Sequence, residues 1–93
     1  MKVRWTQQAL DDLLHLHDYI SEASPQAAGE MVSRIHQAAT VNLKDHPRMG
    51  KKGRVRGTYE LVLAGTPYIV VYILEGTEIQ IVTVLHTSRR WPE

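Results

Sequence analysis

The sequence predicts one small α+β domain, in which an antiparallel helical hairpin packs on a twisted antiparallel sheet of about four strands. Three observations predict this class. Apolar residues recur at helical spacing over residues 7–45, β-rich runs with short glycine-bearing turns fill residues 59–86, and a short alternating run at residues 2–5 precedes both. The expected order over residues 1–93 is therefore β-α-α-β-β-β, which buries both apolar surfaces in the simplest way.

The first helix is expected from about Gln7 to Ser21, directly after the strand at residues 2–5. Thr6 precedes it and has the side chain of a good N-cap. Residues at helical spacing are expected to face the core, and they are Leu10, Leu13, Leu14, His17 and Ile20. This choice of face leaves Asp11, Asp12 and Asp18 on the outside.

The second helix is expected to begin at Ser24 and Pro25, because serine caps a helix and proline suits its first position. Pro47 should end it soon after Asp45. Its apolar stripe consists of Ala28, Met31, Val32, Ile35, Ala38, Ala39 and Leu43. The connection at residues 22–24 is so short that the two helices should form a hairpin.

Three strands are expected in the second half, at residues 59–63, 68–74 and 78–86. Short glycine-bearing connections join them, which is typical of an antiparallel meander. The run at 68–74 is apolar at both odd and even positions, so it should be the central strand, covered on both faces.

The composition restricts the classes of function. The chain has no cysteine, and no apolar run is long enough to span a bilayer, so we expect a cytoplasmic protein without membrane partners. No phosphate-binding glycine loop, nucleophile elbow or metal motif is present, and neither a metal nor a cofactor is expected. The net charge of +1 is uneven, since residues 1–45 sum to −2 and residues 46–93 to +3.

A basic group is the most distinctive feature of the sequence. Five basic residues without an acidic one lie at Arg48, Lys51, Lys52, Arg54 and Arg56, and Arg89, Arg90 and Trp91 lie near the C-terminus. Such a group can neutralise phosphates or meet an acidic protein, and arginine can also stack on bases. The alternative interpretation is a solvated face that keeps a small protein in solution. The stretch at 48–56 should be a mobile loop or an irregular edge strand.

Two titratable residues are candidates for proton transfer. His86 closes the last strand near two arginines, and histidine is the usual general base near neutral pH. Glu60 is the only carboxylate between Asp45 and Glu75, and it should lie one strand from the basic stretch. Each has a structural alternative: His86 could bond a backbone group, and Glu60 could pair with an arginine and hold the loop.

A succession of five motifs resembles the RelE/ParE superfamily of toxins. The motifs are Trp5-Thr6 with Ala9-Leu10-Asp11-Asp12-Leu13, Ser24-Pro25-Gln26-Ala27-Ala28, His46-Pro47-Arg48-Met49-Gly50, Thr58-Tyr59-Glu60-Leu61-Val62 with Pro67-Tyr68-Ile69-Val70-Val71-Tyr72, and Val84-Leu85-His86 with Arg89-Arg90-Trp91. Each motif is degenerate alone, but their order over nearly the whole chain is specific.

The resemblance implies a toxin whose partner is an antitoxin, with a disordered segment that folds on the toxin in a hetero-oligomer. The superfamily divides into two mechanisms. ParE-like members poison DNA gyrase, whereas RelE-like members enter the ribosome and cut mRNA without a metal. The turn at 47–50 and the Leu85-His86 ending resemble ParE, and we lean slightly to that mechanism.

The alternative mechanism, cleavage of mRNA, would use His86, Glu60, Arg54 and Arg56 as catalytic residues. The basic residues Arg48, Lys51, Lys52, Arg54, Arg56, Arg89 and Arg90, together with Trp91, would bind the target under either mechanism. A binding module that has lost its toxicity is a third interpretation.

Overall fold

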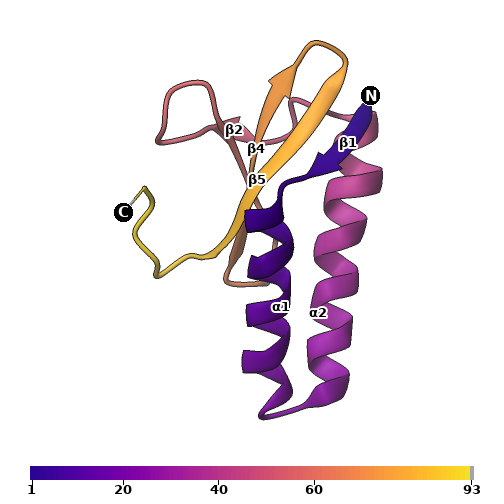
Figure 1. Ribbon diagram of the computed structural model, residues 1–93, viewed down its shortest axis with the longest axis vertical. Helices are drawn as coiled ribbons and strands as arrows, with labels where there is room; N and C mark the ends of the chain where they lie inside the picture. The colour runs from indigo at the N-terminus through magenta and orange to yellow at the C-terminus, as the bar shows by residue number, and fades with distance from the viewer. Residues whose placement is uncertain (93) are drawn as a thin grey trace.

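The computed structural model describes residues 1–92 and contains a helical layer packed on one face of a five-stranded sheet (Figure 1). The elements in chain order are β1 (Lys2–Trp5), α1 (Gln7–Ser21), α2 (Pro25–Gln37), η1 (Ala38–Asn42), α3 (Leu43–Asp45), β2 (Lys51–Lys52), β3 (Tyr59–Val62), β4 (Tyr68–Glu75) and β5 (Glu78–His86). No helix in residues 1–92 is both long and apolar enough to cross a membrane.

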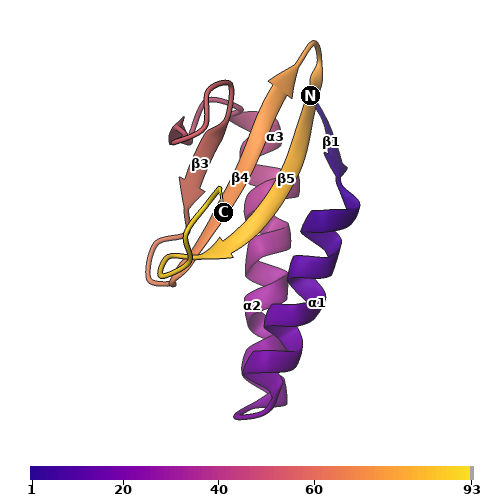
Figure 2. The ribbon, with the colours of Figure 1, turned by 60° about the vertical axis from the view of Figure 1, so that its left-hand side comes forward.

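The strand order is β1-β5-β4-β3-β2, with β4 in the centre as predicted. The sheet differs from the prediction in two respects. It has five strands, because Lys51 and Lys52 pair with Tyr59 and Glu60 as a short edge strand. It is also mixed, because β1 runs parallel to β5. Figure 2 shows β1 beside β5 and passing into α1, which also contacts β5.

Both helices begin where the sequence predicts. The Thr6 side chain accepts a hydrogen bond from Ala9 N at 3.2 Å, and Ser24 Oγ accepts one from Ala27 N at 3.2 Å. Helical backbone continues from Pro25 to Asp45, with one π-helical segment at Ala38–Asn42.

The predicted inner face of α1 is partly wrong: Leu13 and Ile20 pack against the main core as predicted, but Leu10 and Leu14 do not. Leu10 and Leu14 are 43% and 65% exposed, whereas the buried residues of α1 are Ala9, Asp12 and Leu16. The observed inner face is rotated toward Ala9, Asp12 and Leu16, and the sequence did not indicate this because alanine is small and aspartate is charged. The outer leucines therefore form an apolar surface on α1.

The main core lies between the helices and the sheet. Helix residues Ile35, Ala39 and Leu43 pack there against Tyr72 and Ile81, and all five side chains are fully buried. The stripe predicted for the second helix is thereby confirmed.

A second, smaller core covers the opposite face of the sheet. Ile69, Val71 and Leu85 form it, and Val82 and Trp91 pack against them. The C-terminal segment crosses this face after β5 (Figure 2). We refer to this side as the outer face and to the other as the helix face.

The turn between α3 and β2 is fixed by one tyrosine. The buried Tyr72 hydroxyl donates to Pro47 O at 2.8 Å and accepts from Gly50 N at 2.9 Å. A Cβ on residue 50 would lie 2.8 Å from this hydroxyl and 2.9 Å from Glu60 O, so only glycine fits. The turn holds the start of the basic stretch against the sheet.

Candidate functional site

The basic stretch is divided between the two faces of the sheet by the pairing of β2 with β3. Lys52 is opposite Tyr59, which stacks on Tyr72 of the main core with ring centroids 5.5 Å apart. Lys51 is opposite Glu60, which is in register with Val71 of the outer core. Paired residues share a face, so Lys52 lies on the helix face and Lys51 on the outer face.

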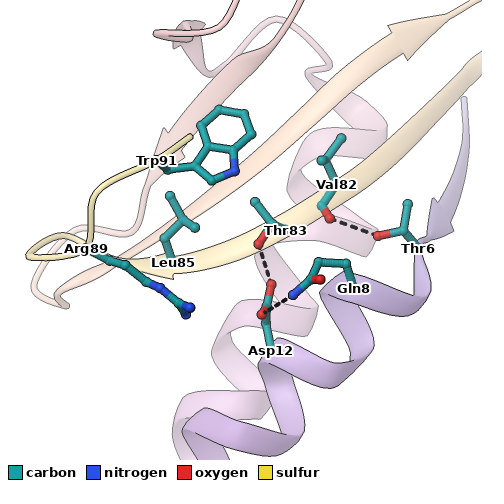
Figure 3. A pocket seen from close by; sticks show the side chains of 8 residues that line it. All are labelled: Thr6, Gln8, Asp12, Val82, Thr83, Leu85, Arg89 and Trp91. Atoms are coloured by element: carbon teal, nitrogen blue, oxygen red, sulfur yellow. Dashed lines mark hydrogen bonds between the residues drawn. The ribbon is translucent and has the colours of Figure 1, made fainter. Parts of the chain in front are cut away.

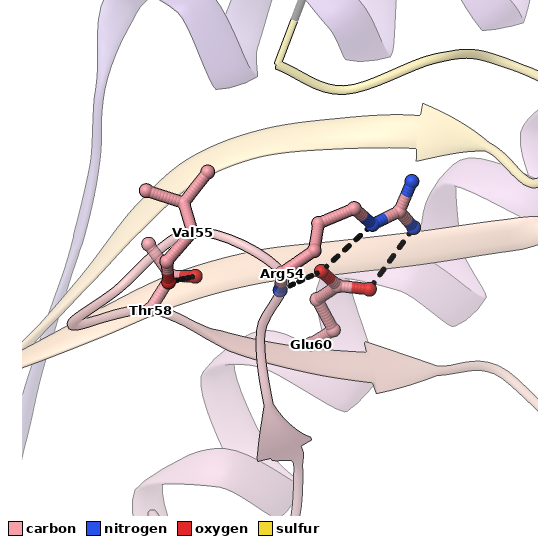
Figure 4. A network of polar contacts seen from close by, with 4 residues as sticks. All are labelled: Arg54, Val55, Thr58 and Glu60. Atoms are coloured by element: carbon pink, nitrogen blue, oxygen red, sulfur yellow. Dashed lines mark hydrogen bonds and ion pairs between the residues drawn. The ribbon is translucent and has the colours of Figure 1, made fainter.

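Glu60 and Arg54 form the strongest polar contact of the outer face (Figure 4). Arg54 Nε and Nη2 each donate to the carboxylate at 3.0 Å, and Arg54 N donates at 2.9 Å. The Glu60 side chain is 4% exposed and that of Arg54 is 41% exposed. Hydrogen bonds from the Arg54 guanidinium lower the pKa of the Glu60 carboxyl below its usual value of 4.5. This pair ties the β2–β3 connection to the sheet.

On the helix face, a hollow of about 380 Å³ collects three basic side chains beside an aromatic ring. Arg48, Lys52 and Arg56 line it, and Arg48 Nη1 donates to the Tyr59 hydroxyl at 3.1 Å. We call this hollow the basic pocket. Its other lining residues are Gly53, Gly57, Thr58 and Leu74.

His86 lies at the end of β5, away from the basic stretch. Its ring meets the ring of Tyr68 edge to face at 5.6 Å, and Ser88 N donates to His86 Nδ1 at 3.1 Å. Tyr68 belongs to the main core and is opposite His86 in the sheet, so His86 is on the helix face. Glu60 is on the outer face and aligns through Val71 with Thr83. Three residues of strand, about 10 Å, separate Thr83 from His86.

The C-terminal residues lie over a hollow of about 460 Å³ beside the free edge of β5 (Figure 3). Its lining residues are Thr6, Gln8, Asp12, Val82, Thr83, Leu85, Arg89 and Trp91. Arg89 and Arg90 are exposed, and Trp91 is half-buried against the outer core. The predicted basic residues thus divide into the basic pocket, the Arg54–Glu60 pair with Lys51, and the C-terminal arginines.

Two residues of these sites were missed in the sequence. Asp12 accepts hydrogen bonds from Val84 N at 3.0 Å and from the Thr83 hydroxyl, although it was expected to face outwards. Tyr59 borders the basic pocket, and its position opposite a lysine could have been found only from the register of β2. For Asp12, the one available signal was its helical spacing from Ala9 and Leu16.

Within residues 1–92, no group of three or more His, Cys, Asp or Glu is arranged to hold a metal.

Fold and surface together define a small α+β protein whose basic side chains lie on its exposed surface. The chain matches, over residues 3–91, the family model described as the ParE toxin of the type II toxin-antitoxin system parDE. The chain belongs to this family of toxins.

Relatives and solved structures agree with this membership. A protein of Sinorhizobium fredii named as toxin Y4kP is 39% identical over 99% of this chain and 94% of its own length. Toxin RelE2 of Caulobacter vibrioides is 33% identical over 95% and 97% of the two chains.

Among solved structures, the chromosomal ParDE system of P. aeruginosa superposes with a TM-score of 0.79 at 27% identity, covering 92% of this chain and 95% of that one. The toxin-antitoxin complex RelBE2 of Mycobacterium tuberculosis gives a TM-score of 0.68 at 27% identity, with coverage of 91% and 88%. This protein is therefore a toxin of a type II toxin-antitoxin system, and an antitoxin is its partner.

Proposed function

We propose that this toxin arrests growth by binding DNA gyrase, and that it has no nuclease activity of its own. The observation that carries the proposal is the separation of His86 from Glu60, which lie on opposite faces of the sheet. These are the residues from which a proton-transferring pair would have to be built.

Metal-free cleavage of RNA needs several groups at one phosphate: a base for the 2′-hydroxyl, donors for the growing charge and an acid for the leaving oxygen. A candidate acid or base must lie within hydrogen-bond reach of the proton that it moves. An offset of about 10 Å along β5, with the sheet between the two side chains, is unfavourable for such a pair. Glu60 is in addition held by Arg54, and its lowered pKa makes it a weak proton acceptor.

The outer face supports a role in binding. It presents Trp91 packed against an apolar cluster, and the exposed Arg89 and Arg90 directly precede Trp91 in the chain. Tryptophan and arginine are the residues that most often dominate the energy of protein interfaces. The similarity to the ParE family model and to the ParDE structure supports the same choice of target.

Cleavage of mRNA at the ribosome is the second candidate function. The number of basic residues on β2 and the relative named RelE2 favour it. In that case His86, Glu60, Arg54 and Arg56 would be the catalytic residues, and the antitoxin would have to shield them.

For the antitoxin, we propose a disordered segment that folds across the helix pair and the sheet. Exposed Leu10 and Leu14 on α1 give it an apolar surface, and a groove beside a helix pair suits an amphipathic helix. Acidic residues of the segment should approach Arg54, Arg56 or Arg89. Arg54 already bonds Glu60, so an acidic partner there would have to share the guanidinium.

The decisive experiment compares His86→Ala with the wild-type toxin in cells and in vitro. A binding inhibitor moves no proton through His86, so we expect the variant to arrest growth and inhibit gyrase supercoiling nearly as well as the wild type. A nuclease that lost its general acid or base would be slowed about 10²–10⁴-fold. His15→Ala, an exposed histidine on α1, is the matched control.

Two results would contradict the proposal. A well-folded His86→Ala toxin that loses its toxicity, with ribosome profiles showing cuts in mRNA only for the wild type, would favour the nuclease. If cells grow normally while the folded wild-type protein is present, there is no toxicity for the antitoxin to neutralise. That result would favour a binding module without toxicity.

A further inference from the structure

We propose that the basic pocket on the helix face binds a backbone phosphate of nucleic acid. The toxin would then contact both the target protein and the nucleic acid bound to that protein. This inference rests on the proposed function in one respect: if gyrase is the target, the nucleic acid contacted is the DNA bound to gyrase. It concerns a surface separate from Trp91 and the outer face.

The geometry of the pocket fits a phosphate. Arg48, Lys52 and Arg56 come from three different segments: the turn after α3, the edge strand β2, and the tight turn before β3. Within residues 1–92, no carboxylate forms an ion pair with any of these three side chains. Three basic side chains thus line one hollow without a paired counter-charge, and a bound phosphate would supply that charge.

The side chains that line the pocket are also held in position by defined backbone and side-chain contacts. Thr58 N donates to Val55 O at 3.1 Å, and Gly57 has a φ of 86°, which defines a tight turn with Arg56 at its tip. Arg48 is oriented by its hydrogen bond to the Tyr59 hydroxyl. The Tyr59 ring is supported from behind by Tyr72 and offers a flat apolar surface next to the cations. A sugar or base beside the phosphate would find a stacking partner there.

The alternation of β2 separates this pocket from the other basic residues. Lys51 is adjacent to Lys52 in the chain and is also exposed, but it lies on the outer face beside Glu60. Lys51 and Lys52 therefore form a matched pair with the same charge, the same strand and opposite faces. A nonspecific attraction of a basic chain for nucleic acid would treat the two lysines alike.

The test measures binding of fluorescent oligonucleotides to the full chain, free of antitoxin, as a function of salt. Each phosphate contact contributes about 0.9 to the slope of log K against log salt for duplex DNA and about 0.7 for single strands. We expect Lys52→Gln to lower the slope by about that amount and to weaken binding on the order of fivefold at about 0.1 M salt. Lys51→Gln should leave both nearly unchanged, and Arg56→Gln should repeat the effect of Lys52→Gln.

Duplex DNA, single-stranded DNA and RNA of one sequence, used in parallel, distinguish the source of the phosphate. Equal effects of Lys51→Gln and Lys52→Gln would overturn the proposal, and so would tight binding of a polyglutamate peptide with no binding of any oligonucleotide. Thermal melts of all variants show whether the fold is intact. A chain that arrests growth and inhibits gyrase but binds no oligonucleotide would refute the phosphate pocket and leave the proposed function standing.

Discussion

Asp12 is the residue that most directly joins the helical layer to the sheet. Strand β1 covers β5 only as far as Ile81, and beyond that point the edge of β5 is covered by side chains. Thr6 Oγ1 bonds the carbonyl oxygens of Ile81 and Val82 at 2.9 Å, and Asp12 accepts from Val84 N. Figure 3 shows the bond from Thr6 to Val82 and the bond from Thr83 to Asp12. A buried backbone N–H without a partner is costly, so Asp12 acts as a substitute for the missing length of β1.

We predict that Asp12→Ala lowers the free energy of unfolding by about 1–3 kcal/mol, because Val84 N would lose its partner. For a domain of this size the melting temperature should fall by about 4–8 °C for each kcal/mol. Asp11→Ala is a closely matched control. Both aspartates accept a hydrogen bond from the glutamine four residues earlier, Gln7 or Gln8, at 2.9 Å. Only Asp12 reaches β5, and equal melting temperatures for the two variants would disprove this role.

At the scale of elements, the β2–β3 connection is a short basic edge whose shape depends on the Arg54–Glu60 pair. A two-residue edge strand has few backbone hydrogen bonds of its own. The three bonds from Arg54 to Glu60 supply what the strand lacks. Because Arg54 pairs with Glu60, the Glu60 carboxylate is neutralised and would not repel a phosphate near the basic residues.

This pair predicts a pH dependence of stability. Arg54 lowers the pKa of Glu60 in the folded protein, so its contribution is fully present above the usual value of 4.5 and is lost as the pH falls through the lower folded-state value. Glu60→Gln should therefore be less stable than the wild type at neutral pH, and the difference should shrink in acid. Melting temperatures measured from about pH 7 to about pH 3 test this. A difference that stays constant across this range would count against the ion pair.

At the scale of the molecule, the apolar anchors that we assign to the antitoxin and to gyrase lie on opposite sides of the sheet, although acidic residues of the antitoxin are also expected to reach Arg54 or Arg89. The exposed leucines belong to α1 of the helical layer, and Trp91 packs on the core of the outer face. Figure 2 shows the helices and the C-terminal segment on opposite sides of the sheet. Because the sheet separates them, a change on one side should leave the other intact. Toxicity and neutralisation should accordingly be separable by mutation.

We predict such a separation for Leu14→Glu and Trp91→Ala. Leu14→Glu should weaken antitoxin binding by roughly tenfold or more and remain toxic, whereas Trp91→Ala should lose toxicity and still bind antitoxin. His15→Glu introduces the same charge at the next exposed position of α1 and serves as the control. Growth assays with and without antitoxin, together with affinity measurements on purified proteins, provide the readout. Parallel losses of both activities in both variants would show that the surfaces are coupled.

Local rules acting over a few residues allowed the sequence alone to determine most of the fold. Thr6, Ser24 and Pro25 set the starts of the helices, Pro47 ended the second, and short turns placed the strands of the meander. The double-sided apolar run at 68–74 identified the central strand for the same reason: alternation along a strand is a local property. The family resemblance followed from the order of these local motifs.

Only the tertiary structure decided which side of each element faces which neighbour. The helical period alone did not determine which side of α1 faces the sheet: the structure buries Ala9, Asp12 and Leu16, and Asp12 accepts from Val84 N at the free edge of β5. Strand pairing likewise placed Lys51 and Lys52 on opposite faces and parted His86 from Glu60. Register and face depend on contacts between residues far apart in the chain, and a shift by a single residue would have reversed each of these assignments.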